Sequence, residues 1–106
     1  MNEGRKNDTG KPRFDLLPPE ALFHLADLYR RGAERYEDRN WEKGMDWGRV
    51  YAALQRHAWK WWGGETYDLD DGQHHLASVA WCALTLLTYE LRNVGTDTRF
   101  KKKETQ

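Results

Sequence analysis

The feature that most constrains the fold of this chain is a polar turn, residues 63–74, between two segments of helical periodicity. The turn opens with two glycines, which favour the end of a helix, and carries four acidic residues but no lysine or arginine. Before the turn, His57 shares a helical face with Leu54; after it, His75 shares one with Ser78. A hairpin of two helices would bring these imidazole and carboxylate groups together, and a cation is the simplest partner for them.

Three segments have the apolar periodicity of helices, at about residues 19–36, 47–62 and 72–92. Asp46 is suited to cap the second helix, and Asp70 followed by Gln73 resembles a capping box for the third. No segment alternates long enough to indicate a strand. The sequence predicts an all-α fold, a compact bundle of three main helices.

Length and charge limit the class of protein. Residues 1–106 are expected to form one domain, with a flexible arm at residues 1–13 and a frayed tail at residues 95–106. Seventeen basic and seventeen acidic residues cancel, which argues against a general nucleic-acid or membrane binder. The single cysteine, Cys82, excludes an internal disulfide framework and fits a cytoplasmic protein. The uncharged run at residues 74–89 is too short and too polar to span a membrane.

The third helix is apolar or small on every face from Leu76 to Leu87. Such a helix must be surrounded, and two partner helices offer too little surface to cover it. We therefore predict a homo-oligomer that associates through this helix.

Five potential metal ligands lie between residues 57 and 75: His57, Glu65, Asp68, Asp70 and His75. Mixed imidazole and carboxylate ligands suit manganese, iron, nickel, cobalt or zinc, whereas magnesium prefers oxygen alone. Each residue also has a structural interpretation, since a lone histidine among tryptophans is often an interior one and Asp70 is a capping candidate.

The loop at residues 39–44 is the second candidate site. Trp41 lies there between polar side chains, where its ring could stack on a nucleobase while Arg39 or Lys43 meets phosphates. The alternative is that Trp41 only anchors its own loop, and the sequence leaves both open.

Several segments together resemble a known family: Gly10-Lys11-Pro12-Arg13-Phe14-Asp15-Leu16-Leu17-Pro18-Pro19, Gly32-Ala33-Glu34-Arg35-Tyr36, Arg39-Asn40-Trp41-Glu42-Lys43-Gly44, Arg56-His57, Gly64-Glu65, Asp68 and Gly72 to His75. They are similar to the phage-borne dATP/dGTP diphosphohydrolase N-terminal family and, more distantly, to the all-alpha MazG-type nucleotide pyrophosphohydrolases. The resemblance covers roughly residues 7–91. It implies cleavage of a purine deoxynucleoside triphosphate to monophosphate and pyrophosphate, in the cytoplasm of a phage host.

Combined with the residues above, the resemblance suggests metal-assisted hydrolysis. The expected metal is Mn²⁺ or Mg²⁺, or a transition metal other than manganese. The candidate catalytic residues are Glu65, Asp68 and His75, and the candidate metal ligands are the five named above. The candidate substrate-binding residues are Lys11, Arg13, Arg39, Asn40, Trp41, Lys43 and Arg56. Neither a membrane nor a nucleic-acid partner is expected.

The MazG pattern is not fully reproduced. Those enzymes hold cations with Glu-X-X-Glu and Glu-X-X-Asp motifs, whereas the corresponding helices here carry residues 56–60, Arg-His-Ala-Trp-Lys, and 75–78, His-Leu-Ala-Ser. Two alternatives therefore stay open. One is a nucleotide-binding protein without turnover that sequesters a nucleotide or nucleotide signal, and the other is a helical oligomerisation module with a solvated turn.

Overall fold

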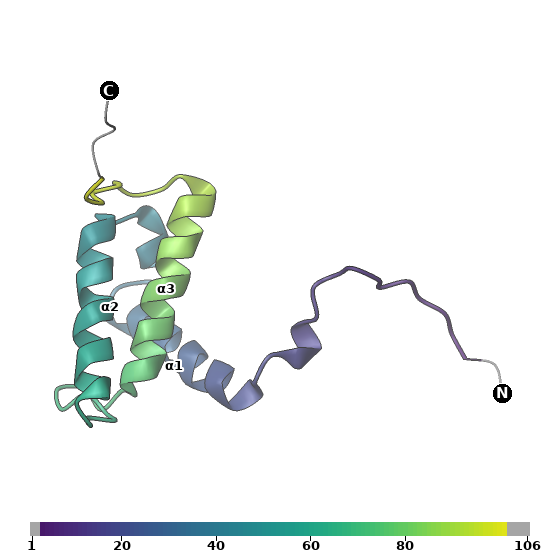
Figure 1. The fold of residues 1–106 in the computed structure, drawn as a ribbon, viewed down its shortest axis with the longest axis horizontal. Coiled ribbons are helices and arrows are strands. Elements are labelled where there is room, and N and C mark those ends of the chain that lie inside the picture. Colours follow the sequence, from purple (N-terminus) through teal and green to yellow (C-terminus); the bar gives the residue numbers. More distant parts are fainter. Residues whose placement is uncertain (1–2, 102–106) are drawn as a thin grey trace.

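The computed structural model describes residues 3–101 and shows three long helices and two short 3₁₀ turns (Figure 1). The helices are α1 (Pro19–Arg35), α2 (Trp47–Trp62) and α3 (His75–Arg92), and the 3₁₀ turns are η1 (Phe14–Leu16) and η2 (Asn40–Lys43). Helices α2 and α3 run side by side in opposite directions, and α1 crosses α3. The all-α, three-helix prediction is confirmed.

The ends of α2 agree with the sequence, whereas the start of α3 does not. Asp46 and Gly63 flank α2 as expected, although the Asp46 side chain makes no capping hydrogen bond. Helix α3 begins at residue 75 instead of 72, because the chain before it folds back on itself: Asp68 N–H donates to the Gln73 carbonyl at 2.7 Å. His74 is the actual N-cap, its ring accepting from Leu76 N–H at 3.0 Å, so the predicted capping box of residues 70 and 73 is wrong.

The apolar core is small and lies between α2 and α3. Its buried members are Trp47 and Val50 from α2 and Cys82 and Tyr89 from α3. Trp41, on η2, packs against this cluster, and its carbonyl accepts a hydrogen bond from the Tyr89 hydroxyl. The core therefore ties η2 to the helix pair at the end farthest from the polar turn.

The described part of residues 95–106 is not frayed as predicted, because it forms hydrogen bonds with the start of α2. Trp47 N–H donates to the Thr96 carbonyl at 3.0 Å, and Gly48 N–H donates to the Thr98 hydroxyl at 2.8 Å. Gly95 permits this close approach, since a Cβ there would lie 2.4 Å from the Met45 carbonyl oxygen. The segment closes the first turn of α2, whose N–H groups lack partners within the helix. Residues 102–106 lie outside the described range.

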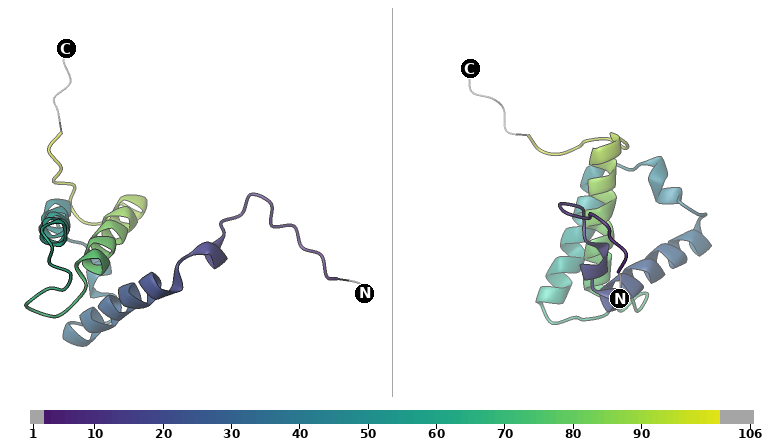
Figure 2. Two further views of the ribbon diagram at one scale, coloured as in Figure 1. Left: turned by 60° about the horizontal axis from the view of Figure 1, so that its bottom comes forward. Right: turned by 90° about the vertical axis from the view of Figure 1, so that its right-hand side faces the viewer.

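The arm at residues 3–13 and the start of α1 extend away from the helix pair (Figure 2). The radius of gyration is 18.0 Å, against about 13 Å for a compact domain of this length. No described residue of α1 is fully buried, including those of its predicted apolar stripe. The flexibility predicted for the arm stays a prediction, and residues 1 and 2 lie outside the described range.

Apolar side chains stay exposed on α3 as well. Leu84 is 40 % exposed and Leu87 is 52 % exposed. This pattern is what self-association through α3 requires, and that association stays a prediction. Within residues 3–101, no helix combines the length and the apolarity needed to cross a bilayer.

Candidate functional site

His57, Asp68 and His75 form one cluster at the polar end of the helix pair, with Asp68 and His75 buried and His57 partly exposed. Each offers one ligand atom, and these atoms all lie within 4.8 Å of one another. The Nδ1 atoms of the two histidines are 2.9 Å apart, and the His57 Nδ1 lies 3.8 Å from the Asp68 Oδ2. His75 is completely buried and Asp68 is 8 % exposed. The hairpin therefore brings both predicted imidazoles and one predicted carboxylate together.

Three different elements position these side chains. His57 lies in the last half of α2, and His75 is the first residue of α3, where its N–H donates to the Thr66 carbonyl at 3.0 Å. Asp68 lies in the turn, and its Oδ1 accepts from Asp70 N–H at 2.9 Å. The turn thus fixes both a helix start and a carboxylate, which explains why a segment without regular structure can hold a precise site.

Glu65 contacts the cluster from outside. Its Oε1 lies 3.1 Å from the His75 Nε2 and also accepts from Leu69 N–H at 3.3 Å. A carboxylate can only accept, so His75 donates through Nε2–H, and its Nδ1 carries a lone pair that points at His57. A histidine held by a carboxylate through one nitrogen, with the other nitrogen free to coordinate, is a common arrangement at protein metal sites.

At 2.9 Å the two ring nitrogens cannot both present lone pairs to each other without a partner between them. With the His75 Nδ1 unprotonated, either a proton on the His57 Nδ1 or a cation must occupy the space, because two lone pairs repel. The donor set of two imidazoles and a carboxylate would suit a transition metal.

The electrostatics favour the forms that bind a cation. Burial lowers the pKa of His57, and the neighbouring His75 lowers it further. The pKa of Asp68 is also below its usual value, chiefly because its carboxylate accepts the Asp70 N–H. Near neutral pH the cluster therefore contains an uncharged imidazole at position 57 and an ionised carboxylate at position 68.

Asp70 and Glu65 are not among the three clustered ligands. The Asp70 side chain is exposed, and only its backbone N–H reaches the cluster through Asp68. Glu65 lies on the far side of the His75 ring. Both were predicted from the sequence as metal ligands, but the Asp70 backbone supports the turn through Asp68, and the Glu65 carboxylate contacts the His75 ring.

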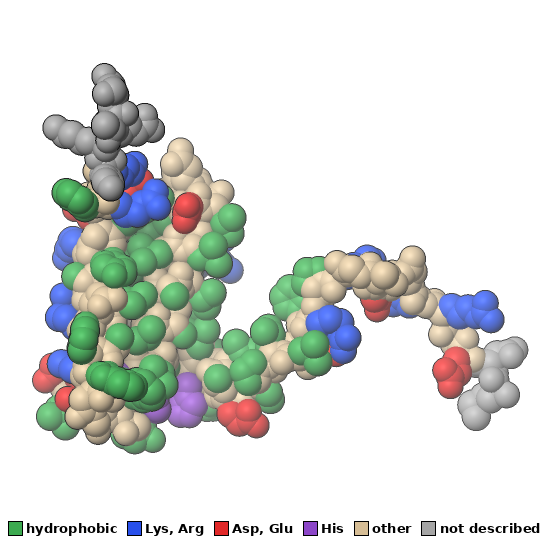
Figure 3. Space-filling model, in the orientation of Figure 1, with side chains coloured by type: hydrophobic (Ala, Val, Ile, Leu, Met, Phe, Trp, Pro, Cys, Tyr) green, Lys and Arg blue, Asp and Glu red, His purple; other side chains and the backbone are tan. Residues whose placement is uncertain are grey.

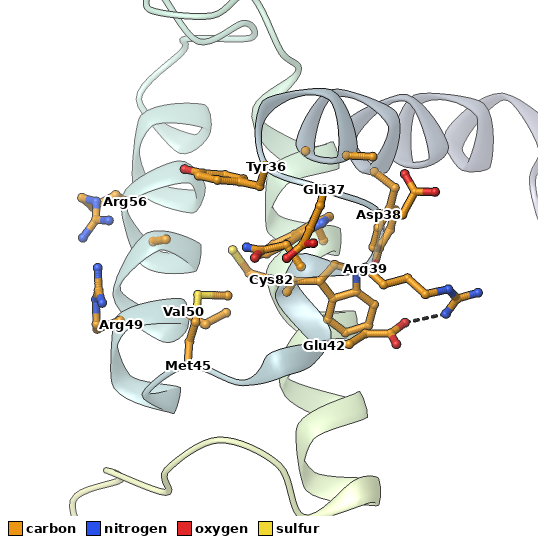
Figure 4. A pocket seen from close by; sticks show the side chains of 17 residues that line it. Tyr36, Glu37, Asp38, Arg39, Glu42, Met45, Arg49, Val50, Arg56 and Cys82 are labelled. Carbon is orange, nitrogen blue, oxygen red and sulfur yellow. Dashed lines mark hydrogen bonds and ion pairs between the residues drawn. The ribbon is translucent and has the colours of Figure 1, made fainter.

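A cavity of about 930 Å³ lies between η2, the end of α1 and the middle of α2 and α3. Its volume is in the range of small-molecule sites, about 300–1,000 Å³. Figure 4 shows Arg49 and Arg56 at one side and Arg39, bound to Glu42, at the other. Ala53 and Arg56 line the cavity from α2, the helix that also carries His57, whereas His57, Asp68 and His75 do not line it.

The candidate substrate-binding residues divide into two groups. Arg39, Asn40, Trp41 and Arg56 line the cavity. Lys43 does not line it, and its ammonium group pairs with Glu37. Lys11 and Arg13 lie on the projecting arm, away from both the cavity and the cluster (Figure 1).

Trp41 anchors its own loop. Its ring centroid is 5.7 Å from that of Tyr29, 6.4 Å from that of Trp81 and 6.3 Å from that of Tyr89. It is half-buried and also lines the cavity, so a flat ligand would meet an aromatic wall already held in place by its neighbours.

Several residues that line the cavity were not predicted from the sequence, notably Tyr29, Tyr36, Arg49 and Trp81. Tyr29 lies on α1 and Tyr36 directly follows its last residue, at a helical spacing that by itself is typical of core packing. Gly32 lies between them and also lines the cavity. A Cβ at that position would meet nothing within 4 Å, so no neighbouring backbone accounts for this glycine.

Comparison with known proteins places the chain in a family. A family model described as dATP/dGTP diphosphohydrolase, N-terminal, matches residues 1–99. No curated protein and no solved structure matches the chain. The more distant resemblance to MazG-type enzymes stays a prediction. Because the match spans nearly the whole sequence, the chain belongs to the dATP/dGTP diphosphohydrolase N-terminal family.

Proposed function

We propose that the chain hydrolyses purine deoxynucleoside triphosphates to monophosphate and pyrophosphate with the help of a divalent cation, Mn²⁺ or Mg²⁺. The family supports the reaction and the substrate class. The observation that carries the proposal is the contact of His57 with His75 beside Asp68, next to a cavity large enough for a nucleotide.

His57, Asp68 and His75 would hold the cation. When bound, such an ion neutralises phosphate charge and lowers the pKa of a coordinated water. Glu65 is a positioning residue in this proposal, because its contact with the His75 Nε2 leaves the Nδ1 lone pair directed at the cluster. The donor set favours Mn²⁺ over Mg²⁺, since two of the three ligands are imidazoles.

The cavity would hold the nucleoside. Trp41 and its aromatic neighbours offer a face for the base, and Gly32 leaves room beside them. Arg56 is adjacent in sequence to His57 and lines the cavity, so its guanidinium is suited to phosphates that run from the cavity toward the cluster.

One observation favours a second function, nucleotide binding without turnover. None of the three clustered ligands lines the cavity, so a nucleotide could bind among the aromatic and arginine side chains without reaching the cation site. Such binding would persist after the removal of metal.

Incubation with a panel of nucleoside triphosphates and Mn²⁺ or Mg²⁺, followed by chromatography of the products, tests the proposal. We expect monophosphate and pyrophosphate from dGTP or dATP, with no product in EDTA. Phosphate release without pyrophosphate would contradict the assigned reaction. Tight binding in EDTA without any product would support the binding function instead.

A further inference from the structure

The arm of residues 3–13 continues through η1 to residue 18, and from here on the arm means residues 3–18. All of these residues are exposed. Phe14 is 77 % exposed and Leu16 is 68 % exposed, although both are large and apolar. The arm nevertheless has local order, since Leu16 N–H donates to the Arg13 carbonyl at 3.1 Å and Leu17 N–H donates to the Phe14 carbonyl at 3.2 Å. Pro18 and Pro19 then restrict the entry into α1. A segment with this order is held away from its own helix pair (Figure 2).

The exposed area is larger than one folded chain of this mass should have. The accessible surface is 9223 Å², against about 6,200 Å² expected for a monomer of this mass. The excess, about 3,000 Å², is several times the roughly 800 Å² that each partner contributes to a standard interface. In the space-filling view, apolar side chains follow the helix pair, α1 and the part of the arm next to α1 (Figure 3). A second copy of the chain offers matching apolar surface.

The opposite charges of the arm and of the turn at residues 63–74 indicate where the arm of such a copy would lie. Residues 3–13 contain four basic and two acidic side chains, whereas the turn at residues 63–74 contains four acidic side chains and no lysine or arginine. Within the described residues, the Lys11 side chain makes no ion pair. Arg13 binds Asp15 through Nε and one terminal nitrogen, which leaves further N–H groups free to donate.

We infer that the chain acts as a symmetric oligomer in which the arm of each copy lies across the acidic turn of a neighbour and adds Lys11 and Arg13 to that neighbour's nucleotide site. The apolar residues Phe14 and Leu16 anchor the arm, and the two basic residues meet the phosphates of the bound nucleotide. The phosphate contact rests on the proposed function, whereas the placement of the arm does not.

Photocross-linking tests the placement without relying on activity. A benzoylphenylalanine replaces Leu16, and ¹⁴N-labelled and ¹⁵N-labelled chains are mixed, unfolded and refolded together before illumination. We expect cross-linked peptides of mixed label that join position 16 to residues 63–74 or the cavity rim. Phe100, 98 % exposed, is the control position and sets the background. Cross-links within one label only, or light scattering that gives a 12.6 kDa monomer, would overturn the inference.

Complementation then tests the role of the two basic residues. One inactive variant carries Lys11→Ala and Arg13→Ala, and the other carries His75→Ala. Mixed oligomers should regain about a quarter of wild-type turnover, because a random mixture pairs an intact site with a neighbour's intact arm in one case out of about four. No recovery, with the mixed-label cross-link present, would overturn the delivery of Lys11 and Arg13 in trans. If the wild-type chain itself shows no turnover, the proposed function fails, and the cross-link alone decides the placement of the arm.

Discussion

The two ends of the interface between α2 and α3 bury different chemistry. The apolar end is formed by Trp47, Val50 and Tyr89, and the polar end by His57, Asp68 and His75. Burial of the apolar end contributes to stability through the hydrophobic effect, at roughly 25 cal/mol for each Å² of apolar surface removed from water. Burial of the polar end costs free energy unless each group finds a partner.

This difference indicates that the apolar end serves stability and that the polar end is a candidate for function. The apolar end closes η2 and the segment after α3 onto the helix pair, so it secures the fold. The polar end brings two histidines so close that a proton or a cation must lie between them, which an apolar packing of the same helices would avoid. A group kept at a cost in stability is a candidate for function.

The largest expected effect is on turnover at the polar end. His75→Ala should reduce pyrophosphate release by at least about a thousandfold, because it removes a ligand from a cation that supplies several kcal/mol of transition-state stabilisation. Its helical circular dichroism should stay at the wild-type level. His24→Ala, which removes an exposed histidine, is the matched control. Turnover by His75→Ala at the wild-type rate would show that the site is elsewhere.

At the apolar end the same kind of truncation should act on stability. Trp47→Ala should lower the free energy of unfolding in urea by about 3–5 kcal/mol, since it empties a buried site and removes the hydrogen bond to the Val94 carbonyl. Trp59 is 67 % exposed, and Trp59→Ala should change stability by no more than about 0.5 kcal/mol. Equal losses from both variants would contradict the assignment of the core.

Glu65→Gln distinguishes a positioning residue from a ligand. The amide can no longer fix His75 as a carboxylate does, so calorimetry should show Mn²⁺ affinity reduced about 10-fold to 100-fold. Asp70→Asn is the control, because the Asp70 side chain lies outside the cluster, and its affinity should stay close to wild type. A larger loss from Asp70→Asn than from Glu65→Gln would reverse the two roles.

Cys82 is a buried residue of α3, and the pH dependence of stability that its thiol causes is a measure of its burial. Burial raises the pKa of this thiol from 9.0 to about 11. Since only the unfolded chain ionises between these values, folding loses up to about 1.4 kcal/mol for each pH unit in that window, and nothing below it. Urea unfolding of wild type and Cys82→Ala at pH 7.5, 9 and 10.5 measures this. The stability difference between them should shift with pH only above about 9, and a constant difference would argue against a buried thiol.

The smallest expected effect is at Gly32, where the cavity meets α1. Gly32→Ala should stabilise the helix by about 0.5–1 kcal/mol, because alanine has the higher helix propensity and its methyl group meets no atom. If the cavity holds the nucleoside, the same methyl group should weaken nucleotide binding, measured by quenching of tryptophan fluorescence. Unchanged affinity would indicate that the nucleoside does not contact this wall of the cavity.

Local patterns predicted the helices well and the turn less well. Apolar periodicity placed α2 at residues 47–62, as observed, because side-chain spacing along a helix depends on nearby residues alone. The start of α3 was wrong by three residues, since Asp68 and Gln73 join by a backbone hydrogen bond that leaves Asp70 inside a loop. Such a bond between residues five apart has no signature in helical periodicity.

For the candidate site, too, the sequence predicted one part of the arrangement and not the other. The convergence of His57, Asp68 and His75 follows from two helices joined by a short turn, so the sequence could indicate it. The position of Glu65 on the opposite nitrogen of His75 depends on how the turn folds back, and sequence spacing does not specify which side of a ring a carboxylate meets.

By itself, the sequence determined the helical class, the polar junction and the family resemblance, because each depends on residue types at short spacing. The tertiary structure decided which carboxylate joins the histidines, which aromatic and arginine side chains line the cavity, and that the arm with Lys11 and Arg13 projects away from the helix pair. These depend on contacts between residues distant in sequence, whose geometry is set by packing and by backbone hydrogen bonds in the turn.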